Sequence, residues 1–308
     1  MRRRRPFHIA IVGAGKVGSV LGKLLSERGA NIVAVISRSH SSARRAGRFL
    51  GCRNTSTALS AIPPDTDIVL ITTPHAAIED VAINLARMEG LDFKHLSVCH
   101  ASGMLTAKVL TPLRRRGATV FSFHPLQTFP RDFPPVKLVQ SARGIHYAVD
   151  GPPEGIQMAK HLARMLDGKV IVIQPRMRAF YHAACVLASN HLTAMLSILE
   201  RMFETLQTSE KRFYPVFEPI LMATLKNIAM TSPREALSGP VARGGIETVA
   251  EHFRSIEQYC PELIPYFAQL SAETVKLAAR KGSITDRQEK ALTKLIRSYT
   301  HSERQETA

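Results

Sequence analysis

Three histidines stand where apolar runs of the chain end. They belong to the segments Thr72–His75, His100–Gly103 and His124–Gln127. An unperturbed imidazole titrates near pKa ~6.5, so it can donate or accept a proton near neutral pH. Each histidine is therefore a candidate proton donor for a reaction that leaves charge on an oxygen or nitrogen atom. The alternative is that each one only ends its strand by bonding to loop backbone.

A second polar set lies on a long segment, Arg176–Leu206, that is apolar almost all round. Its members are His182, Ser189, Asn190 and Thr193. Offsets of seven and four residues predict that three of them share one helical stripe, with Asn190 at its edge. Polar side chains on an apolar helix either find partners in the core or face a cleft. We expect a cleft, with His182 and Asn190 on its substrate side.

A third signal is the glycine- and proline-rich turn Ser238–Gly245, which carries Arg243. An arginine there could clamp a carboxylate or phosphate, although a plain interhelical loop has the same composition. Ser102 and Gly103, next to His100, complete the set of candidate substrate contacts. His100, His124 and His182 could alternatively bind a metal ion, but no His-x-x-x-His spacing or carboxylate partner supports this, and we expect no metal.

The source of reducing equivalents is indicated by a glycine motif near the start of the chain. The apolar run Phe7–Val12 leads directly into Gly13-Ala-Gly15-Lys-Val-Gly18. In this motif the first glycine permits a tight turn, the second admits a pyrophosphate and the third lets the next helix pack closely. A strand, the motif, a helix and a second strand follow in order, which predicts a dinucleotide site. The expected cofactor contacts are Gly13, Ala14, Gly15, Lys16, Val17, Gly18, Ser37, Arg38, Ser39, Thr72, Thr73 and Pro74.

The residues after the second strand favour NADP over NAD. NAD sites usually carry Asp or Glu about 20 residues past the motif. This chain has Ser37-Arg38-Ser39-His40 there, with no carboxylate. Arginine pairs well with a 2′-phosphate, and Arg44 and Arg45 could add to that contact.

The elements that must position these residues alternate between strand and helix over residues 1–174. This pattern predicts an α/β fold, an N-terminal Rossmann domain with a doubly wound parallel sheet. The proline-rich segment Thr128–Pro135 is expected to lie over its site. Residues 175–308 read as an all-α C-terminal domain. The expected strands are Phe7–Val12, Ile32–Ile36, Ile68–Thr72, Leu96–Cys99, Thr119–Phe123, Gly144–Val149 and Val170–Ile173.

Composition sets the broad class. The chain has 308 residues, 45% of them hydrophobic, and a formal charge of +16. The basic residues are dispersed and no nucleic-acid-binding motif is present, so weak, unspecific polyanion binding is the expected consequence. Four scattered cysteines, no signal-peptide pattern and no apolar run of membrane-spanning length predict a cytoplasmic protein.

Together these motifs resemble one family. It joins a Rossmann-like NADP-binding domain to a C-terminal helical domain, the domain of unknown function 2520. The resemblance extends to pyrroline-5-carboxylate reductase, ketopantoate reductase and the β-hydroxyacid dehydrogenases. It implies NAD(P)H in the first domain and a substrate against the first long helix of the second.

Two departures limit what the resemblance implies. The last two of those families use a Lys, then an Asn four residues on, in the long helix, whereas this chain has Tyr181-His-Ala-Ala-Cys-Val186. The last motif usually reads Arg-Gly-Asp, whereas here it is Arg243-Gly244-Gly245.

The sequence therefore predicts an NADP-dependent reductase of a small anionic carbonyl or imine compound, with His100, His124, His182 and Asn190 around the substrate. The missing Lys keeps open a non-catalytic NADP-binding sensor or scaffold. The long apolar helix suggests a homodimer, although burial within one subunit would give the same pattern.

Overall fold

The computed structural model describes residues 5–301, so the N-terminal arginine run and the C-terminal tail lie largely outside it. The chain divides into two compact units, and the boundary falls between Ser189 and Asn190. The strand alternation stops near residue 175, as the sequence indicates, but the next helix, α7 (Arg178–Val186), still belongs to the first unit. The two units are described separately below.

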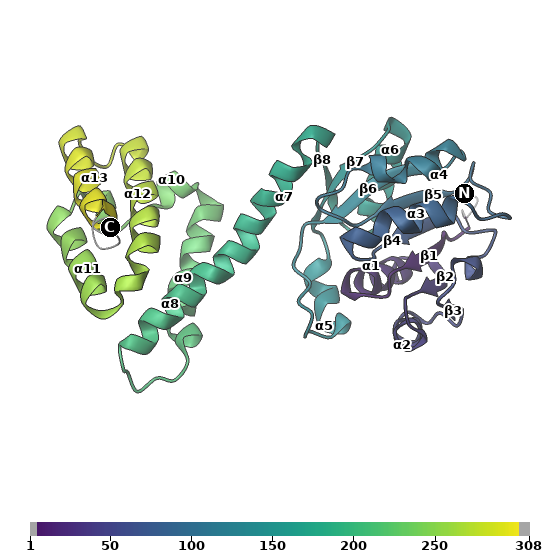
Figure 1. The fold of residues 1–308 in the computed structure, drawn as a ribbon, viewed down its shortest axis with the longest axis horizontal. Coiled ribbons are helices and arrows are strands. Elements are labelled where there is room, and N and C mark those ends of the chain that lie inside the picture. The colour runs from purple at the N-terminus through teal and green to yellow at the C-terminus, as the bar shows by residue number, and fades with distance from the viewer. Residues whose placement is uncertain (1–4, 302–308) are drawn as a thin grey trace, which may run out of the picture. The chain divides into compact units, whose positions relative to one another are not determined.

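The first unit is built on an eight-stranded sheet in the order β3-β2-β1-β4-β5-β6-β7-β8 (Figure 1). The first six strands in this list follow the doubly wound order and are parallel, which confirms the Rossmann prediction. The strands are β1 His8–Val12, β2 Asn31–Ile36, β3 Thr55–Ser56, β4 Ile68–Ile71, β5 Ser97–His100, β6 Thr119–Pro125, β7 His146–Asp150 and β8 Lys169–Val172.

The sheet differs from the expected one in two ways. The short edge strand β3 was not predicted, since two residues carry no periodicity. More importantly, β7 runs antiparallel to β6, and β8 pairs parallel to β7, so the last two strands are reversed. The chain between β6 and β7 holds a proline-rich loop and the five-residue helix α5 (Pro135–Val139). It lacks the full crossover helix that usually joins two parallel strands.

Helices cover both faces of the sheet. Ile9 and Ile11 of β1 pack under α1, α2, α5 and α6, whereas Ala10 and Val12 face α3 and α4. Both faces of the strand are buried, which explains its unbroken apolar sequence. The helices are α1 Lys16–Glu27, α2 His40–Leu50, α3 Ile78–Ala86, α4 Thr111–Arg115, α5 Pro135–Val139 and α6 Pro153–Met165.

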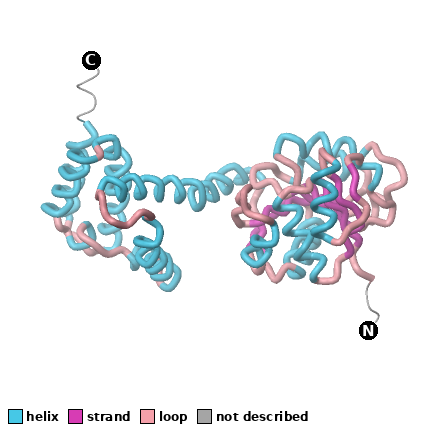
Figure 2. The backbone as a smooth tube through the Cα atoms, turned by 90° about the horizontal axis from the view of Figure 1, so that it is seen from below, coloured by secondary structure: helices cyan, strands magenta, loops and turns pink. Residues whose placement is uncertain are grey.

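The described part of the second unit is built of helices and loops (Figure 2). Its core centres on Phe253, which is fully buried, stacks on Tyr299 and meets Phe267 edge to face. These side chains come from α11, α12 and α13, so the unit has a hydrophobic core of its own. The helices are α8 Leu192–Thr205, α9 Phe213–Met230, α10 Pro233–Ala236, α11 Ile246–Tyr259, α12 Ile264–Lys281 and α13 Asp286–His301.

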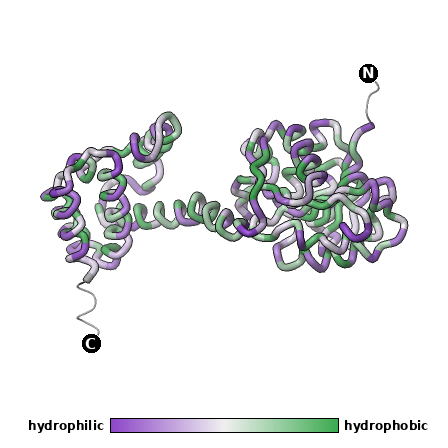
Figure 3. The backbone as a smooth tube through the Cα atoms, turned by 90° about the horizontal axis from the view of Figure 1, so that it is seen from above, coloured by the Kyte–Doolittle hydropathy of each residue, from purple (hydrophilic) through white to green (hydrophobic). Residues whose placement is uncertain are grey.

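A π-helical turn, Leu187–His191, interrupts the long helical run between α7 and α8. Such a turn inserts an extra residue, so the α-helical stripe expected from His182 through Ser189 to Thr193 does not continue in phase. The run Pro175–Thr205 is long and apolar enough to cross a membrane by length and composition, contrary to the sequence expectation, although core helices of soluble proteins pass the same test. Figure 3 shows apolar residues along much of this run.

Large apolar side chains of this run are exposed within one chain. Phe180 is 71% exposed and Leu187 65%. Phe203 is the one buried residue of α8, and none of the 18 residues of α9 is buried. An all-round apolar sequence indicates that a helix is covered, but it does not say by which molecule.

The core of the second unit gives a stability prediction. Phe253→Ala should lower the free energy of unfolding of this unit by about 3–5 kcal/mol, because it leaves a cavity under Tyr299. Denaturant unfolding followed by circular dichroism measures the change. The matched control is Tyr259→Ala on the same helix, where the side chain is 62% exposed and the effect should stay within about 0.5 kcal/mol. Equal losses in both variants would contradict this account of the core.

Candidate functional site

The glycine loop after β1 is fixed by the strands on either side. Gly13 has a φ of 110°, in the region that favours glycine, and its N–H donates to the Ile36 carbonyl at 2.8 Å. A Cβ at this position would lie 2.6 Å from the backbone of Thr72 and Thr73. The Thr72 hydroxyl donates to the Gly13 carbonyl at 2.7 Å. The start of the loop is thus held between β2 and β4.

The other two glycines of the motif have opposite surroundings. A Cβ on Gly18 would lie 2.4 Å from the Thr72 hydroxyl and 2.5 Å from the Gly13 carbonyl, so the helix packs against the loop itself. A Cβ on Gly15 would meet nothing within 4 Å. Gly15 is also the residue from which α1 begins. The open backbone at this helix N-terminus fits the close approach of a pyrophosphate.

A pocket of about 780 Å³ lies over this loop. Lys16 and Arg45 contribute positive charge to its lining, and Phe129, Arg131 and Pro135 come from the proline-rich segment. That segment therefore does lie over the loop, as its sequence suggested. Ala14, Gly15, Val17 and Thr72 also line the pocket.

The serines Ser37 and Ser39, predicted to contact the cofactor, also have structural roles. The Ser39 hydroxyl accepts a hydrogen bond from the Ser42 N–H and caps α2, and the Ser37 N–H donates to the Ser56 carbonyl. Arg38 is exposed between them. The guanidinium of Arg38 is therefore accessible to an anion at the end of β2.

A second pocket, of about 460 Å³, shares Val17 and Thr72 with the first. It lies at the carboxyl ends of β4 and β5, where a doubly wound sheet places its ligands. Its lining brings together residues from three of the predicted segments: Thr73, His75, Ala101, Ser102, Gly103, Met104 and His182. Pro74 lies beside it at the start of a short 3-10 helix.

His100 is sealed within the protein. Its Nδ1 accepts a hydrogen bond from the Ser102 N–H at 3.2 Å, so its proton lies on Nε2, which donates to the Thr106 carbonyl at 3.1 Å. The side chain is fully buried. Burial, with smaller repulsion from Arg178 and His75, lowers the pKa of His100 to about 4. Both ring nitrogens are used in holding the His100–Thr106 loop.

His124 has one nitrogen engaged and one directed to the loop. Its Nδ1 lies 2.8 Å from the Tyr181 hydroxyl of α7. A Cβ on Gly103 would lie 2.9 Å from Nε2 of His124 and 2.6 Å from Cδ2 of His182. Glycine at position 103 therefore lets two imidazoles approach the same stretch of backbone. Burial, followed by repulsion from Arg178, His182 and His100, lowers the pKa of His124 to about 4.

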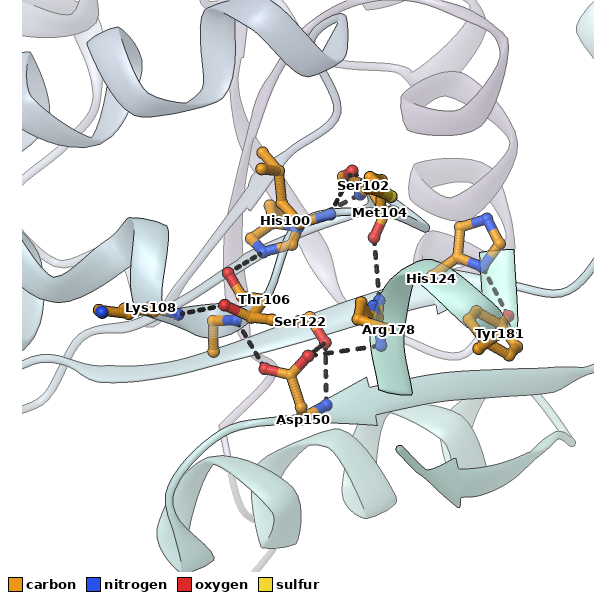
Figure 4. Close-up of polar contacts among 12 residues, drawn as sticks. His100, Ser102, Met104, Thr106, Lys108, Ser122, His124, Asp150, Arg178 and Tyr181 are labelled. Atoms are coloured by element: carbon orange, nitrogen blue, oxygen red, sulfur yellow. Dashed lines mark hydrogen bonds and ion pairs between the residues drawn. The ribbon is translucent and has the colours of Figure 1, made fainter. Parts of the chain in front are cut away.

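A buried ion pair holds this arrangement (Figure 4). Arg178, at the start of α7, lies 3.5 Å from a carboxylate oxygen of Asp150 and donates to the Ser102 carbonyl at 2.9 Å. Asp150 also accepts from the Ala107 N–H at 2.6 Å and the Ser122 hydroxyl at 3.1 Å. Both charged side chains are almost fully buried. The pair thus joins α7 to the His100 loop and to β6.

Arg178, Tyr181 and Asp150 were missed as site residues. The signal for Arg178 was present, because a charge at the start of an apolar helix needs a buried partner. Asp150 follows a predicted strand, as the candidate histidines do. Nothing in the spacing relates Asp150 to Arg178.

The remaining candidates have separate places. His75 is exposed, and its Nδ1 lies 3.2 Å from the Ser102 hydroxyl. Asn190 and Arg243 belong to the second unit, Asn190 in the π-helical turn and Arg243 in the 3-10 helix Val241–Arg243. Gly245 is the N-cap of α11 and, being a glycine, provides no side-chain cap. Within residues 5–301, no three His, Cys, Asp or Glu side chains gather as a metal site.

Solved structures with this fold include several dehydrogenases and reductases. The proposed NADP oxidoreductase BF3122 from Bacteroides fragilis is 21% identical, with a TM-score of 0.68 over 88% of this chain and 99% of its own. Protein TM1727 from Thermotoga maritima is 22% identical, with a TM-score of 0.64 over 96% and 100%. A pyrroline-5-carboxylate reductase from Coxiella burnetii is 14% identical, with a TM-score of 0.58 over 96% and 97%. These likenesses establish the fold.

No curated protein matches the chain. Two family profiles do. Residues 1–125 match the Rossmann-like domain, and residues 145–274 match the domain of unknown function DUF2520. These matches confirm the resemblance drawn from the motifs. The chain therefore consists of a Rossmann-like domain followed by a DUF2520 domain.

Proposed function

We propose that this chain is an NADP-dependent oxidoreductase that reduces a small anionic carbonyl or imine compound. One observation carries the proposal: the pocket over the open Gly15 backbone shares Val17 and Thr72 with the pocket that His182 lines. A dinucleotide with its pyrophosphate at Gly15 would extend its other end along these shared residues. The dehydrogenases and reductases of the same fold support this assignment.

In this proposal the first pocket binds the cofactor and the second the substrate. The backbone N–H groups at the start of α1, with the Lys16 side chain, hold the phosphates, and Arg38 binds the 2′-phosphate. Bound NADPH supplies the hydride. The protein must then direct a hydrogen-bond donor at the heteroatom that gains charge. We assign this role to His182, which lines the second pocket, and to His124, whose Nε2 approaches Gly103 in the lining of that pocket.

His100 acts differently from His124 in this scheme. Its Nε2 proton is donated to the Thr106 carbonyl and its Nδ1 lone pair accepts from Ser102. It is therefore a positioning residue for the Ser102–Gly103 loop. Asn190 and Arg243 remain proposed substrate contacts from the second unit, and the net positive charge favours an anionic substrate.

We further propose a soluble, cytoplasmic homodimer that binds no specific nucleic acid. The exposed apolar side chains of α9, including Ile220, Met222 and Leu225, favour an interface between two copies. An uncovered apolar surface of this kind is unusual in a soluble monomer.

The cofactor assignment predicts that NADPH binds more tightly than NADH in a fluorescence titration. Arg38→Ala should weaken NADPH binding about 10- to 100-fold through loss of a charge-assisted hydrogen bond, and leave NADH binding unchanged. Arg114→Ala, an exposed arginine on α4, controls for net charge. Equal weakening of both nucleotides by Arg38→Ala would contradict the role given to Arg38. Failure to bind either nucleotide would refute the whole proposal.

The catalytic assignment is tested by NADPH oxidation with a panel of 2-oxo acids and cyclic imines. His124→Ala should lower kcat roughly 10²–10⁴-fold and leave NADPH affinity intact. His95→Ala, which removes an exposed histidine, is the matched control. Full turnover in His75→Ala, His100→Ala, His124→Ala and His182→Ala alike would refute a histidine donor. Tight NADPH binding without turnover on any compound would favour a sensor.

The low pKa of His124 predicts acid sensitivity of the fold. The folded protein keeps this imidazole neutral down to about pH 4, whereas the unfolded chain takes up the proton near pH ~6.5. The free energy of unfolding should therefore fall as the pH drops from about 6.5 to 4. His124→Gln should make this fall shallower in urea denaturation measured at several pH values. An unchanged slope would show that His124 does not titrate in this range.

The dimer is tested by light scattering after size exclusion. The unaltered protein should have the mass of two chains, and the double variant Ile220→Glu, Leu225→Glu should have the mass of one, because it puts charge into the apolar surface of α9. Lys226→Glu on the same helix controls for the added charge. A monomeric unaltered protein would contradict the dimer.

A further inference from the structure

We propose that Tyr181 is a positioning residue that holds His124 in the tautomer with its proton on Nε2, directed toward Gly103. The consequence of this tautomer for catalysis rests on the proposed function, but the tautomer itself can be measured in the protein without substrate. Neither the motifs nor the family resemblance singled out Tyr181.

The geometry connects the two rings without intervening groups. The Tyr181 hydroxyl lies 2.8 Å from Nδ1 of His124, and the rings meet edge to face with centroids 5.8 Å apart (Figure 4). His124 is near the end of β6, and Tyr181 is the fourth residue of α7. The opposite nitrogen of the imidazole, Nε2, faces the backbone of Gly103. The hydrogen bond at Nδ1 therefore decides whether Nε2 carries the ring proton and can donate it.

The direction of the hydrogen bond follows from the chemistry of the two partners. Burial raises the pKa of Tyr181, and its hydrogen bond with Cys185 raises it further, so the phenol keeps its proton. That proton can be given to the imidazole nitrogen or to the Cys185 sulfur. Sulfur is a weak acceptor and an unprotonated imidazole nitrogen a good one. Tyr181 thus donates to Nδ1, and the ring proton is on Nε2.

Burial keeps the His124 ring neutral, and its neighbours add to this effect. Arg178 and His182 approach from α7 and His100 from β5, and each one disfavours an imidazolium. The Arg178 guanidinium also lies 5.5 Å from the centre of the Tyr181 ring. A neutral imidazole has one N–H to give. With Nδ1 occupied by Tyr181, that N–H points to the substrate pocket wall.

The test is ¹⁵N NMR of histidine-labelled protein near pH 7, without substrate. In the unaltered protein, Nδ1 of His124 should resonate as an unprotonated nitrogen and Nε2 as a protonated one. In Tyr181→Phe the two resonances should move toward each other, because both tautomers become populated. Tyr147→Phe is the matched control, since it removes the hydroxyl of another buried tyrosine in the same unit, one that has no hydrogen-bond partner. It should leave both resonances in place.

Two outcomes would overturn the proposal. One is a proton on Nδ1 in the unaltered protein, which would make Nε2 a proton acceptor. The other is an unchanged His124 spectrum in Tyr181→Phe, with the fold intact by circular dichroism. Either result leaves the oxidoreductase proposal standing, because NADPH binding and turnover are measured separately.

Kinetics provide a second readout once a substrate is found. Tyr181→Phe should lower kcat roughly tenfold with unchanged NADPH affinity, the size expected for loss of one buried hydrogen bond. The double variant Tyr181→Phe, His124→Ala should be no slower than His124→Ala alone, because Tyr181 acts through His124. Additive losses would mean that Tyr181 acts on the substrate independently.

Discussion

The arrangement of the site depends on one buried ion pair, Arg178 with Asp150. Taking two charges out of water is costly, and removing one partner of such a pair typically costs about 3–5 kcal/mol because the other charge is stranded. Part of this cost is offset by the hydrogen bonds to Ser102, Ala107 and Ser122, while Nε and Nη1 of Arg178 are buried without a hydrogen-bond partner. The same contacts fix the loop behind His100 and the start of α7. The relative places of His124, Tyr181 and His182 follow from that docking.

The reversed strand β7 makes this ion pair possible. Across the sheet, His100 is aligned with Ser122, and Ser122 with Asp150. A parallel β7 would carry its last residue to the edge of the sheet that His124 occupies. Because β7 runs the other way, Asp150 lies two residues deeper in the sheet than His124, where it supports the loop after His100. The departure from a fully parallel sheet therefore supplies the carboxylate that a buried arginine requires.

The sequence predicted those features that depend on residue type and local spacing. The glycine motif, the seven longer strands and the gathering of histidines near the Ser102–Gly103 loop are of this kind. The reversal of β7 and the pairing of Arg178 with Asp150 are long-range, and no period of the chain encodes them. The π-helical turn in the long helix was not predicted, because its polar stripe was derived with the period of an unbroken α-helix. The exposed apolar surface of α9 could not be predicted, since composition cannot tell intramolecular from intermolecular burial.

Gly103 has a consequence for reading the sequences of relatives. The glycines at positions 13 and 18 are demanded by the path of the backbone, so any chain with this fold would keep them whatever its chemistry. Gly103 is demanded by two imidazole rings that lie where its side chain would be. A relative with a larger residue at this position must move at least one ring away. Variation at position 103 thus separates chains that share the arrangement of histidines from chains that share only the architecture.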